Sequence, residues 1–257
     1  MKPNFCVITT TYQRPEAILR CIASVETQSY QAWQHIVVID DIVSDYEPLR
    51  SLAHSATHLT LINNPQNLGK NASVNRAFEY LNQQAFTGYV IFLDDDDWLA
   101  ADCLADFADR LHKTPYPWLV SERVEANTKK SFTTNHTKVD VISYQYHCLI
   151  KKDFIGDATH CIDFASTNNI SFPLSIKNAE EWLYFAHVST IHPRFIYIPK
   201  AGTWSEGYAS AGLTDLYHQN QERTKNAIPL LKETLQRHIF SPLILSYVFL
   251  RLIRSFF

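Results

Sequence analysis

The chain has 257 residues, of which 46% are hydrophobic and 19% are charged, and its formal net charge is -3. This length and composition allow one large hydrophobic core, which excludes wholesale disorder, and the charge argues against a generic nucleic-acid binder. The 5 cysteines include no CxxC pair, so neither a zinc ribbon nor a disulfide scaffold is indicated and a reducing compartment fits best. The 11 histidines show no pair at metal-ligand spacing.

Short apolar runs alternate with segments of helical spacing through the first 125 residues. The runs are rich in Val, Ile and Phe, and they predict buried strands at residues 5–8, 35–39, 59–62, 89–93 and 118–120. The segments between them predict helices at residues 16–27, 70–84 and 99–112. This alternation predicts an α/β fold with a mostly parallel central sheet and helices on both faces.

The pattern becomes less regular from about residue 138. It predicts strands at 139–143, 146–151 and 195–198, and a helix at 179–188. Three of the 6 glycines lie within residues 202–212, which we expect to form a mobile loop.

Four consecutive aspartates, Asp94 to Asp97, follow the apolar run at 89–93. In an open α/β sheet, ligands bind beyond the carboxyl ends of the strands. Four carboxylates there repel one another, so a cation should compensate them, and oxygen ligands suit Mg²⁺ or Mn²⁺ bridging to substrate phosphates. The alternative is a solvated acidic turn that caps the next helix.

Three further strand ends carry polar residues. The first, ITTTYQRPE at residues 8–16, can hold a nucleotide on free backbone N–H groups but has no Walker loop. The second ends in Asp40 and Asp41, which can accept hydrogen bonds from a base or ribose. The third leads through the Gly69 loop into a helix with Asn75 and Arg76. Taken singly, each can be ordinary capping or turn chemistry.

In order and spacing these motifs resemble those of the inverting family two glycosyltransferases of the GT-A fold, the bacterial polysaccharide and lipopolysaccharide type. The resemblance covers roughly the first 190 residues. The T-Y-N-R-like turn is matched by residues 10–14, the D-D strand end by Asp40 and Asp41, and D-x-D-D-W by Asp94, Asp96, Asp97 and Trp98. The N-x-G-x-x-x-A-x-N motif is matched by Asn67, Gly69, Ser73 and Asn75, with the alanine one position early at Ala72.

The resemblance implies a Rossmann-like GT-A fold and an enzyme that transfers a sugar from a nucleotide-sugar donor, with UDP the expected nucleotide. It implies Mn²⁺ or Mg²⁺ held by Asp96 and Asp94. Together with the strand-end argument, it gives as donor-binding residues Thr10, Thr11, Tyr12, Arg14, Asp40, Asp41, Lys70, Asn75, Arg76, Asp94 and Asp95.

The family also places a catalytic base on a helix after the metal motif, in an E-D-W-like segment. Residues 178–187, NAEEWLYFAH, match it: Glu181 takes the position of the base, and Glu180 precedes it. A single base suffices for one inverting displacement, whereas a retaining double displacement needs a nucleophile that no motif identifies. Trp182, Trp204 and Tyr208 are candidates for stacking on acceptor sugars, although aromatic residues are more often part of a core.

Two other functions stay open on the sequence alone. A sugar-phosphate nucleotidyltransferase also uses an α/β sheet and a metal, but it usually carries a Gly-rich amino-terminal loop. A non-catalytic glycan-binding protein on the same fold is expected to have lost the carboxylates, which this chain keeps. The expected acceptor is a hydroxyl of a growing surface glycan, which a lipid can carry.

The last 43 residues, 215–257, form a basic and apolar segment with six Lys or Arg and three acids. Its uncharged stretch, 239–250, is well short of the ~20 residues that span a bilayer. It fits an interfacial helix with arginines toward anionic headgroups, or a helix docked on the catalytic domain or on a dimer partner.

These features divide the chain into a GT-A catalytic domain at 1–214 and a C-terminal helical appendage at 215–257 for membrane association or oligomerisation. The nucleotide part is expected at 1–125 and the acceptor part at 126–214. The expected location is cytoplasmic, peripheral at the inner face of the cell membrane.

Overall fold

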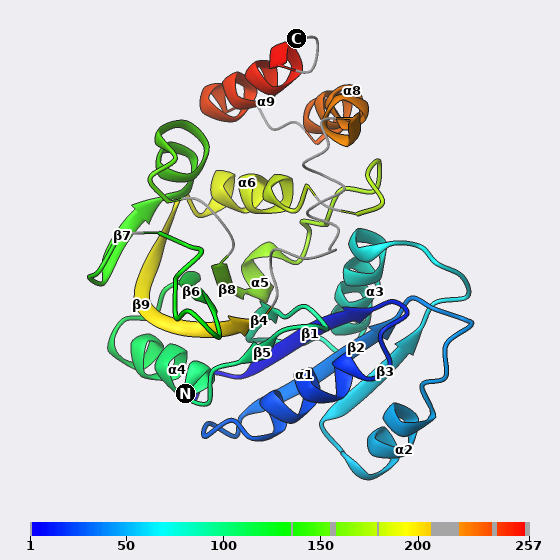
Figure 1. Cartoon of the computed structure of the whole chain (residues 1–257). Helices are drawn as coiled ribbons and strands as arrows, with labels where there is room; N and C mark the ends of the chain where they lie inside the picture. The colour runs from blue at the N-terminus through cyan, green and yellow to red at the C-terminus, as the bar shows by residue number, and fades with distance from the viewer. Residues whose placement is uncertain are drawn as a thin grey trace.

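A computed structural model describes residues 2–134, 136–154, 158–178, 180–206, 221–237 and 241–254. These residues form a mixed sheet of nine strands covered by helices (Figure 1). The strands are β1 (Phe5–Thr11), β2 (Trp33–Ile39), β3 (Leu59–Asn63), β4 (Tyr89–Phe92), β5 (Trp98–Leu99), β6 (Trp118–Glu125), β7 (Asp140–Ser143), β8 (Ala158–Asp163) and β9 (Arg194–Ser205). The α-helices are α1 (Ala17–Glu26), α2 (Glu47–Ser55), α3 (Lys70–Gln83), α4 (Cys103–Lys113), α5 (Phe164–Thr167), α6 (Trp182–Ile191), α8 (Gln221–Gln236) and α9 (Pro242–Arg254).

The amino-terminal half of the sheet is parallel, in the order β3-β2-β1-β4. Its strands alternate their side chains between two hydrophobic cores, because successive residues of a strand point to opposite faces. In β1, Cys6 and Ile8 enter one core while Phe5 and Val7 enter the other. Helices α1, α2 and α4 cover one face, and α3 and α6 the other (Figure 1). The predicted strands of this half and the helices predicted at 16–27 and 70–84 are confirmed. The helix predicted at 99–112 begins only at Cys103, because Leu99 belongs to β5.

The other half of the sheet contains both parallel and antiparallel strand pairs. β8 lies antiparallel between β4 and β6, and β5 and β7 are antiparallel to β9, whereas β6 and β9 are parallel. The α/β class is therefore right, and the sheet is mixed.

Two local expectations are wrong in this half. Residues 146–151 were expected to be a strand but belong to a π-helix, η1 (Tyr144–Lys151). Residues 202–205 were expected to begin a mobile loop but complete β9, whose length comes from pairing with both β6 and β5. The rest of that expected loop, from 207 onward, lies outside the described residues.

The two C-terminal helices pack on the catalytic body above α6 and η1 (Figure 1). Leu230 of α8 and Ile244 and Val248 of α9 are buried in the same core as the strands and α6. The expected appendage is thus an integral part of the body, while its predicted boundary at 214 falls outside the described residues. In the part of the chain described here, no helix combines the length and the apolarity needed to cross a membrane.

Candidate active site

The acidic turn after β4 lies at the carboxyl edge of the parallel strands and is surrounded by cationic side chains. Asp94 contacts Lys70 Nζ at 2.5 Å and Arg123 Nη1 at 3.5 Å. Asp97 is nearly buried, accepts from Ser205 Oγ at 2.5 Å and pairs with Arg123 Nη2 at 2.6 Å. Arg123 therefore joins the first and last aspartates of the turn.

The two middle aspartates share one guanidinium. Arg14 Nη1 lies 3.0 Å from Asp95 Oδ1 and 2.5 Å from Asp96 Oδ2. Arg20 of α1 donates to the backbone carbonyl of Asp96 at 2.9 Å, which fixes the turn itself. Asp96 remains 48% exposed, so its carboxylate faces the open side of the site.

Two carboxyl groups of this turn are harder to ionise than an ordinary aspartate. Burial raises the pKa of Asp95 to about 6 and that of Asp97 to about 7, despite the guanidinium beside each. Burial also opposes ionisation of Asp94, but Lys70 and Arg123 hold its pKa well below the ordinary value. A cation bound among these carboxylates would favour their ionised form.

Three of these carboxylates fit a hard divalent cation. Oxygens of Asp94, Asp96 and Asp97 lie within 4.8 Å of one another. Mg²⁺ and Mn²⁺ prefer oxygen ligands, and a few carboxylates plus substrate phosphates complete their shell. The predicted pair Asp94 and Asp96 thus lies together, and Asp97 is a third acid that the prediction did not include.

Lys70 at the start of α3 connects this turn to the predicted base. Its ammonium lies 2.5 Å from Asp94 Oδ1 and 2.6 Å from Glu181 Oε1. Although burial opposes it, the two carboxylates raise the pKa of Lys70. Glu181 immediately precedes α6 and keeps 36% of its side chain exposed, so a substrate hydroxyl can reach it.

Glu180 has a different environment from its neighbour. Its side chain is 0% exposed, and both of its oxygens accept from Arg251 of α9 at 2.6 Å. The indole N–H of Trp182 also donates to it. Its φ of 61° is a left-handed conformation that a non-glycine residue adopts only when its surroundings impose it. The sequence placed both glutamates in the catalytic group, and the structure brings only Glu181 to the acidic turn.

The segment before Glu180 rests on the amino-terminal end of α3. Gly69 has φ +92°, and a Cβ there would lie 2.4 Å from the carbonyl oxygen of Lys177. Asn71 donates to the carbonyls of Pro173 and Ile176, at 3.0 and 2.9 Å. Glycine is needed here because the two backbones touch, and this contact fixes where Glu181 points.

Several predicted donor-binding residues make internal contacts. Asp40 is buried and accepts from the side chain of Asn64 and from the backbone of Leu68 and Gly69, at 2.6–2.7 Å. Asn75 exchanges two hydrogen bonds with the backbone of Phe172. Arg76 donates to the carbonyl of Asn63 and to the Asn64 side chain. These residues build the loop that supports Lys70.

Asp41 and the first turn remain available to a nucleotide. Asp41 accepts from the backbone of Val43 and Ser44, and although burial opposes it, these and further hydrogen bonds lower its pKa. Tyr12, which directly follows β1, is 45% exposed. Thr10 is partly buried, and Thr11 is buried with its hydroxyl 3.4 Å from that of Tyr46.

The three aromatic residues predicted to bind the acceptor have different environments. The Trp182 ring packs edge-on against Tyr247 of α9 at 4.8 Å, and so it is largely part of the core. Trp204 lies on β9 opposite Trp98 of β5, with Lys129 4.4 Å from its ring centre. Tyr208 lies outside the described residues.

Arg123, Ser205 and Arg251 are the site residues that the sequence did not indicate. Arg123 follows an apolar run that was expected to be a strand, so the strand-end argument applied to Asp94 could have found it. Ser205 and Arg251 are 108 and 71 residues from their partners, and no local pattern marks them.

The chain is similar to known glycosyltransferases in sequence and in fold. The model of the family described as Glycosyl transferase family 2 matches residues 6–171. A curated Escherichia coli relative, the UDP-Glc:alpha-D-GlcNAc-diphosphoundecaprenol beta-1,3-glucosyltransferase WfgD, is 26% identical over 171 residues. That alignment covers 66% of this chain and 64% of the relative, so the chain spans less than two thirds of the relative's length.

Solved structures show the same fold. S. aureus TarS 1-349 in complex with UDP-GlcNAc has 20% identity and a TM-score of 0.69, covering 93% of this chain and 73% of that one. TarS 1-349 alone has a TM-score of 0.64 at 17% identity, covering 89% of this chain and 65% of that one. The mannosyltransferase PcManGT from Pyrobaculum calidifontis, in complex with GDP-Man and Mn2+, has 15% identity and a TM-score of 0.61, covering 99% of this chain and 74% of that one. The family match decides against a nucleotidyltransferase, and the chain belongs to glycosyl transferase family 2, with the GT-A fold.

Proposed function

We propose that this protein is an inverting glycosyltransferase that moves a sugar from a UDP-sugar to a hydroxyl of a lipid-linked surface glycan. The observation that carries the proposal is the position of Lys70, whose ammonium contacts both the first aspartate of the acidic turn and Glu181. One cation thus joins the group that would meet the donor diphosphate to the group that would take the acceptor proton. A non-catalytic glycan-binding protein has no need of this arrangement.

The choice of substrates rests on the relatives. WfgD is described as using UDP-Glc and an acceptor on diphosphoundecaprenol, and TarS was solved with UDP-GlcNAc. Both names indicate UDP, although PcManGT was solved with GDP-Man. We therefore assign UDP as the nucleotide and a diphosphate-linked lipid glycan as the acceptor class.

The reaction follows from the contacts around Glu181. The acceptor hydroxyl gives its proton to the Glu181 carboxylate as its oxygen attacks the anomeric carbon of the donor. The bond from that carbon to the diphosphate oxygen breaks, and the electron pair leaves with the nucleoside diphosphate. Lys70 and Arg14, freed from part of their present ion pairs, can receive the charge of the diphosphate.

A divalent cation, Mn²⁺ or Mg²⁺, would be held by Asp94 and Asp96, and it would neutralise charge on the departing diphosphate. Asp97 is placed to adjust the position of Arg123 beside that ion. The proposed donor site is completed by residues at the ends of β1, β2 and β4, namely Thr10, Thr11, Tyr12, Asp41 and Asp95. The loop after β3 would support this site through hydrogen bonds of Asp40, Asn75 and Arg76.

Acceptor binding is assigned to Trp204, on the side of the site formed by β9. Tyr208 stays a candidate from the sequence alone. Membrane association is assigned to the outward face of α9, where Phe249 and Leu250 are 59% and 50% exposed. Apolar side chains on an exposed helix favour an interfacial position, and basic residues in 215–257 favour anionic lipids. Arg251 does not take part in this contact, contrary to the expectation that the arginines face headgroups, because it pairs with Glu180.

The proposal is tested by following nucleoside diphosphate release. The full chain is incubated with a panel of UDP-, GDP- and dTDP-sugars, a synthetic GlcNAc-diphospholipid, and Mn²⁺ or EDTA. We expect release of UDP that needs both the metal and the lipid acceptor, with an inverted anomeric configuration in the product. If no sugar nucleotide is consumed, or if EDTA leaves the rate unchanged, the proposed function or the metal assignment is wrong.

A further inference from the structure

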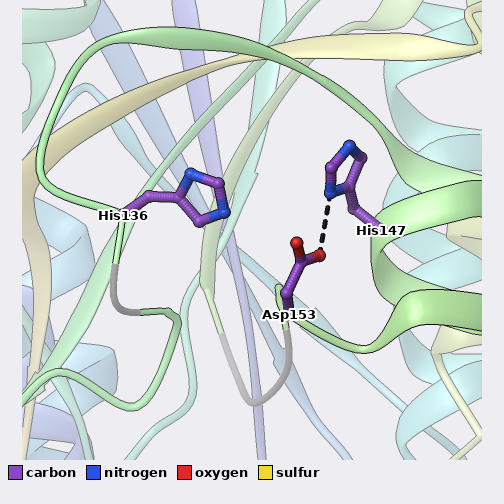
Figure 2. A group of neighbouring side chains, drawn as sticks. All are labelled: His136, His147 and Asp153. Atoms are coloured by element: carbon purple, nitrogen blue, oxygen red, sulfur yellow. Dashed lines mark hydrogen bonds and ion pairs between the residues drawn. The ribbon is translucent and has the colours of Figure 1, made fainter.

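Two histidines and an aspartate converge outside the acidic turn. His136 lies between β6 and β7, His147 lies in η1, and Asp153 follows the end of that helix (Figure 2). One ligand atom of each lies within 4.8 Å of the others, and His147 Nδ1 is 2.8 Å from Asp153 Oδ1. The two histidines are 11 residues apart and match no metal-binding motif, so the spacing of histidines along the chain does not reveal this cluster.

We propose that His136, His147 and Asp153 form a second metal site, for a Zn²⁺-class ion, that is distinct from the Mg²⁺- or Mn²⁺-type site of the acidic turn. Zn²⁺ is bound by imidazole nitrogens and carboxylate oxygens at about 2.0–2.2 Å. Such bonds place neighbouring ligand atoms ~3.4 Å apart. All three side chains are only partly buried, so small side-chain rotations can close the group to this spacing.

The backbone around the three residues is held by its own hydrogen bonds. The hydroxyl of Thr134 donates to the carbonyl of Asp153 at 2.9 Å and accepts from the backbone N–H of His136 at 3.2 Å. The Tyr197 hydroxyl donates to the carbonyl of His136 at 3.1 Å. One threonine thus fixes two of the three ligand-bearing segments, as outer contacts do around metal ligands.

The π-helix supplies the third segment. Such helices are rare and occur frequently at functional sites, because the extra residue in each turn changes the direction of the side chains that follow. Here η1 presents His147 toward Asp153, and Lys152 ends it in a left-handed conformation with φ 57°. Zn²⁺ would replace the hydrogen bond between His147 and Asp153 with two bonds to the ion.

The surrounding charges select the kind of metal. Lys151 contacts the second oxygen of Asp153 at 2.6 Å, and Lys138 and Lys152 line the adjoining cavity of about 660 Å³. One carboxylate among ammonium groups is a poor site for Mg²⁺ or Ca²⁺, which depend on several charged oxygens. Two imidazoles favour Zn²⁺, Co²⁺ or Ni²⁺ instead. The cavity leaves a fourth position for water or a ligand.

The site would act as a clamp on the acceptor side of the enzyme. It joins the loop before β7 to η1, and the Tyr144 hydroxyl of η1 donates to the carbonyl of Trp182 at 3.2 Å, next to the proposed base. Ser241, just before α9, donates to Gln145 of η1 at 2.5 Å. Metal binding would therefore restrain η1, which contacts both the start of α9 and the residue next to the proposed base.

Metal binding is measured directly on the full chain, after removal of metals, by Zn²⁺ titration against a chromophoric chelator and by Co²⁺ absorption. We expect one Zn²⁺ per chain, visible d–d bands with Co²⁺ and a rise in Tm with Zn²⁺. His147→Gln and His136→Gln should each weaken Zn²⁺ binding at least ~100-fold, the upper range for disturbing even an outer contact of a metal site. Both should keep the metal-free Tm.

Two controls make the outcome decisive. His112→Gln removes an exposed histidine of α4, and Asp96→Asn alters the acidic turn. Both should bind Zn²⁺ as the unaltered protein does. The proposal is overturned if the protein binds no Zn²⁺, if His136→Gln and His147→Gln bind it normally, or if only Asp96→Asn loses it.

Discussion

Arg251 and Glu180 form a bidentate ion pair, with both N–O distances at 2.6 Å, between the last helix and the residue before the proposed base. The Glu180 side chain is 0% exposed and that of Arg251 is 19% exposed. The C-terminal helix thus holds the backbone that presents Glu181. This relationship makes α9 part of the catalytic body, whatever its outer face contacts.

Arg251→Met should destabilise the protein by about 3–5 kcal/mol, because it leaves a buried carboxylate without its partner. The double variant with Glu180→Gln should recover much of this loss, since the buried charge is then gone. Urea unfolding of the two single variants and the double variant measures the coupling. Additive losses would show that the ion pair does not hold α9 in place.

Gly69→Ala should lower stability by ~1–3 kcal/mol, the usual range for imposed backbone strain, and should also lower kcat. The added Cβ meets the Lys177 carbonyl, so the segment leading to Glu181 must shift. Gly88→Ala is the matched control, because its Cβ would also meet a carbonyl oxygen, that of Asn4 at 2.4 Å. Gly88 precedes β4, whereas the acidic turn follows the other end of that strand. The control should lose stability alone; equal losses of kcat in both variants would contradict the assigned contact.

One buried histidine, His35, and one partly buried histidine, His160, should make folding sensitive to acid. Burial lowers the pKa of His35 and of His160 to about 3, against an ordinary value of 6.5. Between these pH values the unfolded chain binds more protons than the folded one, so stability falls as pH falls below about 6.5. Each histidine contributes a slope of up to about 1.4 kcal/mol per pH unit.

Denaturation of His35→Gln at pH 7.5, 6.5 and 5.5 isolates one of these contributions. Its stability should fall less steeply with acid than that of the unaltered protein, even if its stability at pH 7.5 is lower. His54→Gln, an exposed histidine of α2, is the control and should keep the full slope. An unchanged slope in His35→Gln would mean that His35 is not buried in its neutral form.

The outward face of α9 should bind anionic vesicles. Phe249→Asp should reduce flotation with phosphatidylglycerol vesicles by ~10-fold or more, since burying a large apolar side chain is worth about 1.5–3 kcal/mol. UDP release with a water-soluble acceptor should persist. Ile228→Asp on α8, where Ile228 is 65% exposed, is the comparison for nonspecific charge effects. Absence of flotation by the unaltered protein would remove the membrane assignment.

The sequence predicted the parallel half of the fold because each of its strands is a continuous apolar run between turn residues. It missed β8, whose residues ATHCID mix polar and apolar types, although the strand is buried between β4 and β6. It also interpreted 146–151 as a strand, since nothing local distinguishes a π-helix from a short apolar run. Pairing with β4 and β6 decided the case of β8.

Some residues of the candidate site could be predicted from local sequence and others could not. The aspartates, Lys70 and Glu181 belong to local motifs whose order along the chain is informative, so they could be assigned in advance. Asp40 and Asn75 belong to the same motifs, yet their hydrogen bonds support loops. A motif identifies residues that the fold requires without distinguishing binding from support. The pairing of Arg251 with Glu180 depends on tertiary packing alone.

The most direct test of the account is the turnover of Glu181→Gln, measured as UDP release with a GlcNAc-diphospholipid acceptor beside the calorimetric affinity for UDP with Mn²⁺. Loss of a positioned general base lowers kcat by ~10²–10⁴-fold. We expect a loss in this range with nearly unchanged UDP affinity, because Glu181 is proposed to contact the acceptor hydroxyl. Normal turnover in Glu181→Gln would contradict its assignment as the catalytic base.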